Sequence, residues 1–481
     1  MTALDAADTG IRVVRGGLIR AVGYGLTLVL GAAASVFLLR HLGVVEFGRY
    51  ALVMSLIGVV AGITDAGLSV ITTRELAVRP PGERREVIAS LVGLRLVLTP
   101  IGIALVLGVA VLAGYPHSVL VGILIAGAGL VLINIQASLS IPLAVELRNG
   151  RLTAVEVTKQ AIGTFGIAAL AILGAGLIPF FGVQILIGVG ILALTPVLVG
   201  RRYLVAPRFD RGIWRRLIVE ALPLAAAFVL GHIYFRILMV LVSLLATARE
   251  TGYFAASFRV FEFLSVIPIM LAGVVLPVMA AAADQDRVRY AYILRRTSEV
   301  GLLCGVFLAL MVAILAEPAL VTLGGEAYRP AAPVLRIQAL ALVGIFLSQA
   351  GFAGLVALRA QREVAVATAV GIVAVLALGL GLIPSHGAEG GALAVALGDA
   401  VLAVTVLWLL WRHDGTKAVT GGYVARVALA VLVAVAPLLV GGVPDVVLAV
   451  VSGVLFVGTA LLLHLVPSEV LDGIPRLRSR R

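Results

Sequence analysis

The stretch GAGLIPFFG, from Gly174 to Gly182, returns as GLGLIPSHG, from Gly379 to Gly387. A second pair has nearly the same spacing, because EFGRYA at Glu46 to Ala51 is echoed by ETGYFA at Glu250 to Ala255. The two offsets are about 205 and 204 residues and keep the same order, which is typical of a chain that contains an internal duplication. The sequence therefore predicts two similar lobes, one copied from the other.

Composition indicates that these lobes lie in a membrane. Of the 481 residues, 61% are hydrophobic and 13% are charged, against about 25% charged in ordinary soluble domains. The 54 glycines suit helices that pack closely through small residues in lipid. The single cysteine, Cys304, allows neither an intrachain disulfide nor a cysteine metal cluster. We expect no metal and no cofactor.

Apolar runs of about 20 residues, the length of a membrane-spanning helix, predict an all-α polytopic membrane protein of about 14 transmembrane helices. The predicted spans are 16–39, 48–72, 87–113, 118–145, 155–177, 181–200, 217–246, 253–283, 298–323, 331–358, 364–384, 388–411, 426–442 and 444–466.

Positive charge orients these helices, because Lys and Arg accumulate in cytoplasmic loops. Of the 37 Lys and Arg residues, 28 fall in the two tails or after even-numbered spans, and four fall after odd-numbered spans. Both termini are therefore predicted to be cytoplasmic in a multi-pass protein of the cell membrane. The net charge of +12 is spread over one membrane face, which fits an anionic inner leaflet and argues against nucleic-acid binding. The dominance of Arg over Lys is typical of a GC-rich bacterial genome.

The repeat offset divides the chain into two pseudo-symmetric six-helix lobes plus two further helices. The predicted parts are a cytoplasmic tail at 1–15, an N-lobe of helices 1–6 at 16–200, a cytoplasmic interfacial linker at 201–216, a C-lobe of helices 7–12 at 217–411, and two additional helices with a basic tail at 412–481.

Several stretches resemble one known family. They are FLLRHLGVVEFGRYALVMSLIGVVAGITDAGL and the following TTRELA, then ETGYFAASFRVFEFLSVIPIMLAGVVLPVMA, GGEAYRPAAPVLRIQALAL and GLIPSHGAEGGALA. They are similar to the polysaccharide, or lipid-linked oligosaccharide, flippases of the multidrug/oligosaccharidyl-lipid/polysaccharide exporter superfamily. The resemblance implies two six-helix bundles with a cavity between them, and movement of a polyprenyl-linked sugar to the outer leaflet. Family members often carry an acid just after the arginine of helix 7, where this chain has Ile237 and Leu238.

Charged side chains inside the spans are the candidate site, because a charge near mid-bilayer costs at least about 2.5 to 3.5 kcal/mol. Arginine suits a lipid-linked diphosphate, because the guanidinium binds phosphate oxygens in pairs and stays protonated. The predicted cationic cavity residues are Arg20, Arg95, Arg236 and Arg259. The predicted coupling or ion-pair residues are Asp65, Glu262 and His232.

Pairing among these residues competes with binding. Asp65 lies at a depth similar to that of Arg20 and Arg95, so a salt bridge to either arginine is geometrically reasonable. Arg259 and Glu262 are three residues apart on one helical face and favour a local ion pair. His232 is compatible with titration during transport or with packing.

The expected function is a flippase that moves a polyprenyl-(pyro)phosphate-linked oligosaccharide or polysaccharide precursor from the inner to the outer leaflet by alternating access. H⁺ or Na⁺ is the candidate coupling ion, and a polysaccharide polymerase or glycosyltransferase is the expected neighbour. The alternatives are a lipid II flippase and a cation-coupled multidrug exporter of the same fold. An enzyme is disfavoured, because the predicted outer loops are short and nearly free of acids, and the chain has no Gly-Lys pair for a phosphate-binding loop.

Overall fold

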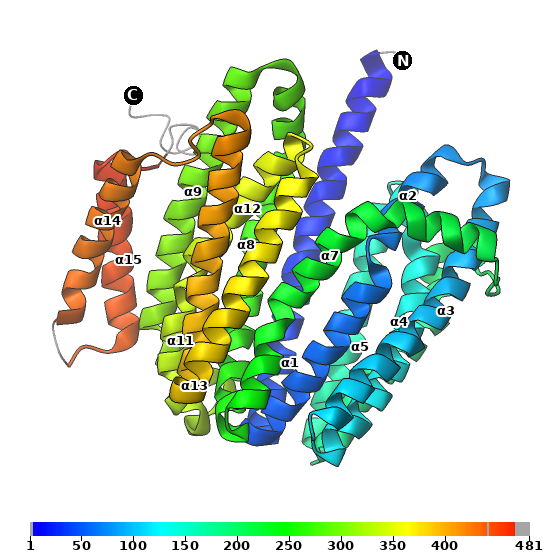
Figure 1. Ribbon diagram of the computed structural model, residues 1–481, viewed down its shortest axis with the longest axis horizontal. Coiled ribbons are helices and arrows are strands. Elements are labelled where there is room, and N and C mark those ends of the chain that lie inside the picture. Colours follow the sequence, from blue (N-terminus) through cyan, green and yellow to red (C-terminus); the bar gives the residue numbers. More distant parts are fainter. Residues whose placement is uncertain (1–2, 440–441, 467–481) are drawn as a thin grey trace. The chain divides into compact units, whose positions relative to one another are not determined.

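The computed structural model describes residues 3–439 and 442–466, with most side chains from Arg20 onward (Figure 1). The chain forms two compact units, Met1–Val240 and Leu241–Arg481. Throughout the described part of the chain, the regular secondary structure is helical. The basic carboxyl tail predicted to be cytoplasmic lies outside the described residues.

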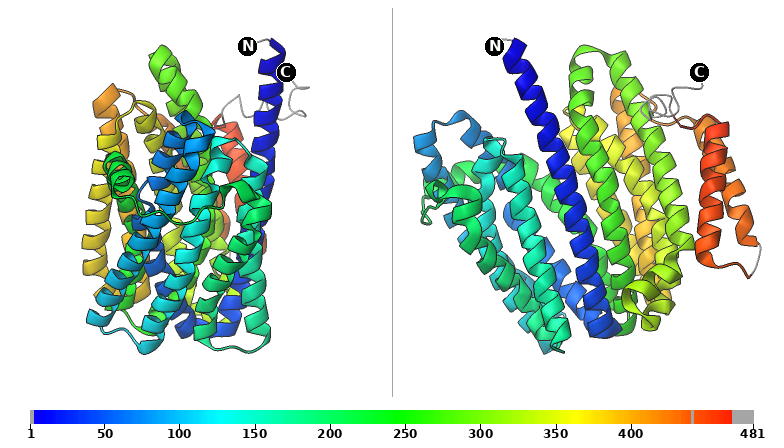
Figure 2. Two further views of the ribbon diagram at one scale, coloured as in Figure 1. Left: turned by 90° about the vertical axis from the view of Figure 1, so that its right-hand side faces the viewer. Right: turned by 180° about the vertical axis from the view of Figure 1, so that it is seen from behind.

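The first unit is built from long helices joined by short turns. Its elements are α1 (Ala3–Asp65), α2 (Leu68–Val78), α3 (Pro81–Leu112), α4 (His117–Val145), α5 (Asn149–Ile172), α6 (Leu177–Thr195), a π turn (Pro196–Gly200), a 3-10 turn (Arg201–Tyr203) and the larger part of α7 (Arg211–Leu245). α4 packs against α3 and α6, and α1 packs along α5, as the rear view in Figure 2 shows. α1 contains two antiparallel spans, because Gly43 adopts a φ of 68° and breaks it.

The second unit repeats this construction. Its elements are α8 (Ala248–Gln285), α9 (Arg287–Ile314), α10 (Ala316–Gly324), a 3-10 turn (Glu326–Ala331), α11 (Ala332–Ala339), α12 (Ala341–Ala357), α13 (Gln361–Asp414), α14 (Gly421–Val435), a 3-10 turn (Ala436–Leu439) and α15 (Asp445–Leu462). α12 packs against α8, α9 and α13, while α14 and α15 form a hairpin that packs on α9. α13 is also two spans, broken at Gly387 with a φ of 54°.

These helices confirm the predicted fold class. Eleven stretches of the described helices are long and apolar enough to cross a membrane, and the shorter apolar part of α7, Val229–Leu245, adds one more. Two of the eleven contain two spans each, since α1 and α13 are broken at glycine. The number of spanning segments in the described chain therefore agrees with the fourteen predicted.

Backbone geometry also repeats between the units. Leu147, just after α4, has a φ of 54°, and Arg359, just after α12 and 212 positions later, has a φ of 60°. The glycine–proline stretches differ, however. The first chain reversal uses Gly174, at the start of its stretch, and the second uses Gly387, at the end of its stretch. The two sequence echoes therefore do not occupy equivalent turns, because the chain reverses before the proline in one copy and after it in the other.

The segment before α7, predicted as an interfacial linker, packs on α3 of the same unit. The Arg208 backbone N–H donates to the Ala89 carbonyl at 3.0 Å, and the Trp214 indole N–H donates to the Ser90 carbonyl at 2.8 Å. A Cβ at Gly93 would lie 2.3 Å from the Arg208 carbonyl oxygen, so this contact requires glycine. Asp210 accepts from the backbone N–H groups at the start of α7, chiefly that of Ile213, which lowers the pKa of its carboxyl. This backbone capping fixes where α7 begins.

Candidate functional site

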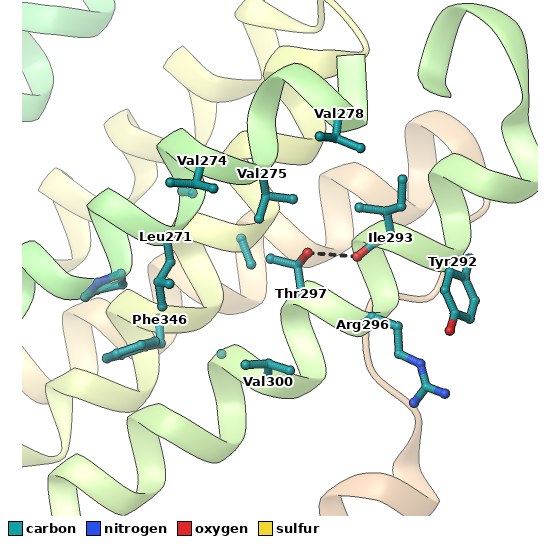
Figure 3. Close-up of a pocket in the computed structure, with 14 residues that line it drawn as sticks. Leu271, Val274, Val275, Val278, Tyr292, Ile293, Arg296, Thr297, Val300 and Phe346 are labelled. Carbon is teal, nitrogen blue, oxygen red and sulfur yellow. Dashed lines mark hydrogen bonds between the residues drawn. The ribbon is translucent and has the colours of Figure 1, made fainter. Parts of the chain in front are cut away.

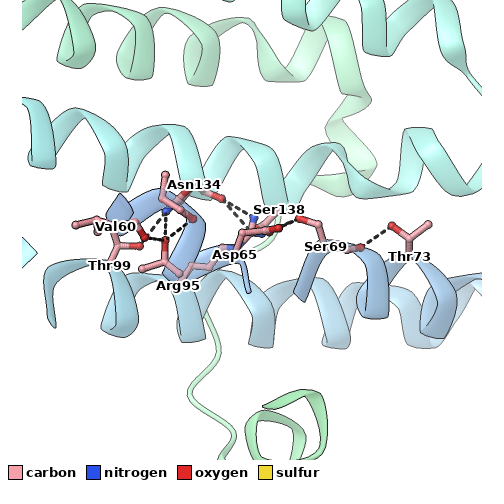
Figure 4. Close-up of polar contacts among 10 residues, drawn as sticks. Val60, Asp65, Ser69, Thr73, Arg95, Thr99, Asn134 and Ser138 are labelled. Atoms are coloured by element: carbon pink, nitrogen blue, oxygen red, sulfur yellow. Dashed lines mark hydrogen bonds and ion pairs between the residues drawn. The ribbon is translucent and has the colours of Figure 1, made fainter. Parts of the chain in front are cut away.

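A buried polar cluster crosses the interior of the first unit, and we call it the Arg95 network (Figure 4). It joins side chains from α1, α2, α3 and α4. Its members are Thr64, Asp65, Ser69, Arg95, Thr99, Asn134 and Ser138. Polar groups at membrane depth need partners within the protein, because lipid offers none. The network supplies them.

Arg95 is the centre of this network. Its side chain is 2% exposed and forms an ion pair with Asp65. One Nη also donates to the Ser69 hydroxyl at 2.8 Å, and the other donates to the Ser138 hydroxyl at 3.0 Å and to the Asn134 carbonyl at 3.3 Å. Of the two predicted partners for Asp65, the structure selects Arg95. In this conformation the Arg95 guanidinium is held by protein groups and does not face water.

Asp65 stands at a break in a spanning segment. α1 ends at Asp65, then Ala66 and Gly67 adopt φ values of 36° and 77°, and α2 resumes at Leu68. The Ser69 hydroxyl donates to the Asp65 carboxylate at 2.6 Å and so ties the two sides of the break together. Counted from Leu112 at the apolar end of α3, Arg95 is about 26 Å away at 1.5 Å per residue, so the break lies inside the roughly 30 Å hydrocarbon core, close to one boundary. Discontinuous helices of this kind recur at the ion and substrate sites of transporters.

α7 brings two more predicted residues to the same region. A Cβ at Gly62 of α1 would lie 2.3 Å from the His232 ring, and a Cβ at Gly58 would lie 3.2 Å from the Arg236 Nε. Gly58 and Gly62 are four apart on α1, as His232 and Arg236 are on α7. The glycine pair thus forms a groove that admits two polar side chains, where larger residues would hold the helices apart.

Four ionisable side chains of the first unit are therefore neighbours, in the order Arg236, His232, Asp65 and Arg95. His232 lies close enough to Arg236 and Asp65 to interact electrostatically with both. Asp65 in turn pairs with Arg95. Four of the seven predicted site residues are therefore brought together, although α7 is distant from α1 and α3 in the sequence.

The other three candidates lie elsewhere. Arg259 and Glu262 form the predicted local ion pair on α8 of the second unit, at 2.9 Å, and the Arg259 guanidinium lies 4.9 Å from the Phe263 ring centroid. Arg20 is exposed on the first half of α1. Its predicted alternative pairing with Asp65 is not the one adopted.

Sequence reasoning missed the neutral members of the network. Asn134 donates to the hydroxyls of Thr64 and Thr99 at 3.2 and 3.0 Å, and so links α4 to α1 and α3. A signal was available, because Asn134, Gln136, Ser138 and Ser140 alternate with apolar residues inside one span. On a helix Asn134 and Ser138 share one face and Gln136 and Ser140 share another, and polar side chains at such density in a membrane helix indicate polar packing partners.

Among the described residues, no group of three or more histidine, cysteine or acidic side chains is arranged to hold a metal ion.

Comparison with known proteins identifies the family of this chain. Residues 13–283 match the model of the polysaccharide biosynthesis protein family. A search of curated proteins gives no match.

Solved structures share the fold. The lipid II flippase MurJ in an inward closed conformation is 15% identical, with a TM-score of 0.74 over 93% of this chain and 99% of that one. An inward-facing multidrug resistance MATE transporter is 15% identical, with a TM-score of 0.61 over 82% and 98%. A transporter of the MOP superfamily from Pyrococcus furiosus, described as having a binding pocket of reverse polarity, is 16% identical, with a TM-score of 0.58 over 84% and 95%.

The family match covers more than half of the chain, from the first half of α1 almost to the end of α8, and includes the whole Arg95 network. The chain therefore belongs to the polysaccharide biosynthesis protein family, and it has the fold of the MurJ and MATE transporters of the MOP superfamily.

Proposed function

We propose that this protein is a flippase that moves a polyprenyl-(pyro)phosphate-linked oligosaccharide or polysaccharide precursor from the inner to the outer leaflet by alternating access. The observation that carries the proposal is the position of Arg236. It is a half-buried guanidinium inside a membrane helix, seated in a glycine groove next to the Asp65–Arg95 pair. Family membership supports the proposed class of substrate, and a guanidinium is suited to bind its phosphate.

The candidate residues take different roles in this proposal. Arg236 and Arg259 contact substrate phosphate during transit, because both are partly exposed and guanidinium pairs with phosphate oxygens. Arg20, exposed on α1, attracts the anionic head group. Arg95 is a positioning residue, because its Nη atoms already serve four protein groups.

Coupling is assigned to the acids and the histidine. Asp65 is 33% exposed and Glu262 is 20% exposed, so protein does not fully enclose either carboxylate while it is paired with an arginine. Binding of H⁺ or Na⁺ to either carboxylate, or titration of His232, weakens its hold on the neighbouring cation. We propose this exchange as the link between an ion gradient and the conformational cycle.

The basic loops support a proposal for the location and orientation of the protein. We propose a bacterial cell-membrane protein with both termini cytoplasmic and with a polymerase or glycosyltransferase of the same pathway as neighbour. A lipid II flippase is the second candidate, because MurJ shares the fold over nearly the whole chain. A cation-coupled multidrug exporter is the third, because MATE transporters share it too.

Reconstitution in proteoliposomes tests the proposal. The probe is a fluorescent polyprenyl diphosphate-linked disaccharide, and dithionite reports which leaflet holds the label. One charge-assisted hydrogen bond contributes about 1.5 to 3 kcal/mol, so Arg236→Gln should slow flipping about 10- to 100-fold, and Arg236→Lys should slow it less. Arg249→Gln is the matched control, because Arg249 is exposed at the start of α8 and bonds to Tyr253.

The outcomes separate the candidates. Unchanged flipping by Arg236→Gln would remove Arg236 from the site. Movement of ethidium, with no movement of the glycolipid by wild-type protein, would establish the exporter instead. Preference for a lipid-linked muropeptide over other lipid-linked saccharides would identify the lipid II flippase.

A further inference from the structure

A pocket of about 400 Å³ opens between α8, α9 and α12 in the second unit (Figure 3). Its walls are almost wholly apolar and include Leu271, Val275 and Val278 of α8, Ile293 and Val300 of α9, and Phe346 of α12. Pro268 and Pro277 interrupt the hydrogen bonding of α8 over this stretch. The volume falls in the range of pockets that hold a small ligand, about 300 to 1,000 Å³.

Positive charge borders this apolar space. Arg296 and Tyr292 lie at one edge, with the guanidinium 5.4 Å from the tyrosine ring centroid. Arg296 pairs with the buried Glu299 at 3.1 Å, and Arg295 pairs with the same carboxylate at 3.0 Å. Two guanidinium groups on one carboxylate leave a net charge of one positive unit. Tyr423 of α14 donates to the Glu299 backbone carbonyl at 3.0 Å and holds this turn of α9 in place.

The depth of the pocket matches a lipid. α9 is about 42 Å long at 1.5 Å per residue, which exceeds the roughly 30 Å of the hydrocarbon core. Counting back from Ile314, Arg296 is about 27 Å away, which places it near the opposite hydrocarbon boundary. Lipid phosphates lie at that level, and the apolar part of the pocket extends from there toward the membrane centre. On the pocket wall Val274 is 74% exposed and Leu271 is 43% exposed within the second unit, so apolar side chains line the pocket opening.

We infer that this pocket binds an anionic phospholipid, with one acyl chain between α8 and α9 and the phosphodiester on Arg296. The net charge of one positive unit complements the single negative charge of a phosphodiester such as that of phosphatidylglycerol. Thr297, on the pocket wall, donates its hydroxyl to the Ile293 carbonyl at 2.8 Å, so the backbone already engages this hydroxyl. The pocket therefore selects an apolar chain and an anionic head, and it has few groups that recognise a sugar.

A phospholipid fits this site better than the transported glycolipid. The pocket spans about nine residues of α9, from Tyr292 to Gly301, or roughly 14 Å. That length holds part of one acyl chain, whereas a polyprenyl tail is several times longer. The inference is independent of the proposed transport function, since it concerns retention of a membrane lipid.

Native mass spectrometry of the full-length protein tests the site. The protein is released from vesicles of equal parts phosphatidylglycerol and phosphatidylcholine with matched chains, and the retained lipids are counted. Both head groups offer a phosphodiester to Arg296, but the net positive charge at the pocket edge repels the choline cation. We therefore expect wild-type protein to retain phosphatidylglycerol about fivefold over phosphatidylcholine. Arg296→Gln should abolish the preference. Arg295→Gln should also reduce the preference, because it lowers the net charge at the pocket edge from one positive unit to zero. Arg289→Gln is the matched control, because it removes an exposed cation from the first turn of α9 outside the pocket lining, and it should retain the preference.

A second pair of variants tests the apolar part. Val275 points from α8 toward Thr297 of α9 across the pocket in Figure 3, so Val275→Trp fills the space and should reduce retention of both lipids. Ile269→Trp adds the same bulk at an exposed position of α8 outside the pocket and should have no effect.

Several results would overturn the inference. These are equal retention of the two lipids by wild-type protein, wild-type retention by Val275→Trp, and displacement of phosphatidylglycerol by polyprenyl phosphate at equal mole fraction. If Arg296→Gln does not fold, the wild-type preference and the Val275→Trp result still decide whether the pocket binds an anionic phospholipid. Flipping of the fluorescent glycolipid is measured separately, so loss of lipid retention and loss of transport are distinguishable.

Discussion

Removing the charge of Asp65 should destabilise the protein more than removing its partner, Arg95. The reason is their unequal burial, because the Arg95 side chain is 2% exposed and the Asp65 side chain is 33% exposed. Asp65→Asn leaves a guanidinium deep in protein without a counter-ion. Arg95→Met leaves a carboxylate that protein only partly encloses and that still accepts from Ser69 at 2.6 Å.

The magnitudes follow from this asymmetry. Breaking a buried ion pair by removing one partner costs about 3 to 5 kcal/mol. We expect Asp65→Asn to lower the free energy of unfolding by about 3 kcal/mol, near the low end because asparagine keeps an oxygen that accepts from Arg95. Arg95→Met should cost about 2 kcal/mol, chiefly through the hydroxyls and the carbonyl that lose their donor. The double variant should lose at least about 2 kcal/mol less unfolding free energy than the two single variants lose together, because neither charge remains.

Detergent-driven unfolding in mixed micelles, followed by circular dichroism, measures all four proteins of this double-mutant cycle. Transport by the same proteins is recorded in parallel. Additive single effects, within about 0.5 kcal/mol, would show that the pair is not coupled. A larger loss for Arg95→Met than for Asp65→Asn would refute the reasoning from burial.

Two further predictions concern packing. Gly62→Ala would put a Cβ 2.3 Å from the His232 ring, so α7 must shift, and we expect slower flipping at normal membrane abundance. Gly25→Ala is the control, because a Cβ there has nothing within 4 Å, and it should leave the flipping rate unchanged. Tyr423→Phe removes the single O–H that two carbonyl oxygens share, those of Glu299 and Leu465, each 3.0 Å away. This should cost about 1 to 3 kcal/mol. Earlier proteolysis between α13 and α14 would report the loosened hairpin, and an unchanged cleavage rate would contradict this role for the hydroxyl.

Much of this fold was predictable because each spanning helix must be long, apolar and internally hydrogen bonded. Those requirements are local, so spans and their number can be read from the sequence. The Asp65–Arg95 pair was predictable as one of two options, because depth along a helix can be counted. The choice between Arg20 and Arg95 depends on the orientation of α1 and α3 about their own axes, which the sequence does not determine.

The contact of α7 with α1 was not predictable for a related reason. Gly58 and Gly62 form a small-xxx-small pair, but nothing in the sequence says that His232 and Arg236 occupy the groove. Reversal at Gly174 in one copy and at Gly387 in the other was also hidden, because both stretches carry the same glycine and proline signals. Local signals identify a turn to within several residues, and packing of the flanking helices decides where it falls.

The separation of roles between Arg95 and Arg236 follows from what an irregular backbone needs in a membrane. The break at Ala66 and Gly67 interrupts the helix inside the hydrocarbon core, where lipid offers no hydrogen bonds. Arg95 crosslinks the two sides of that break through Asp65 and Ser69, and a residue so occupied cannot release its partners at every cycle without exposing the break. Arg236 lies in the glycine groove of α1 and belongs to α7, so it is not one of the groups that bridge the break. In the transport cycle that we propose, Arg95 therefore holds the discontinuous helix together, while Arg236 exchanges its protein contacts for the substrate anion.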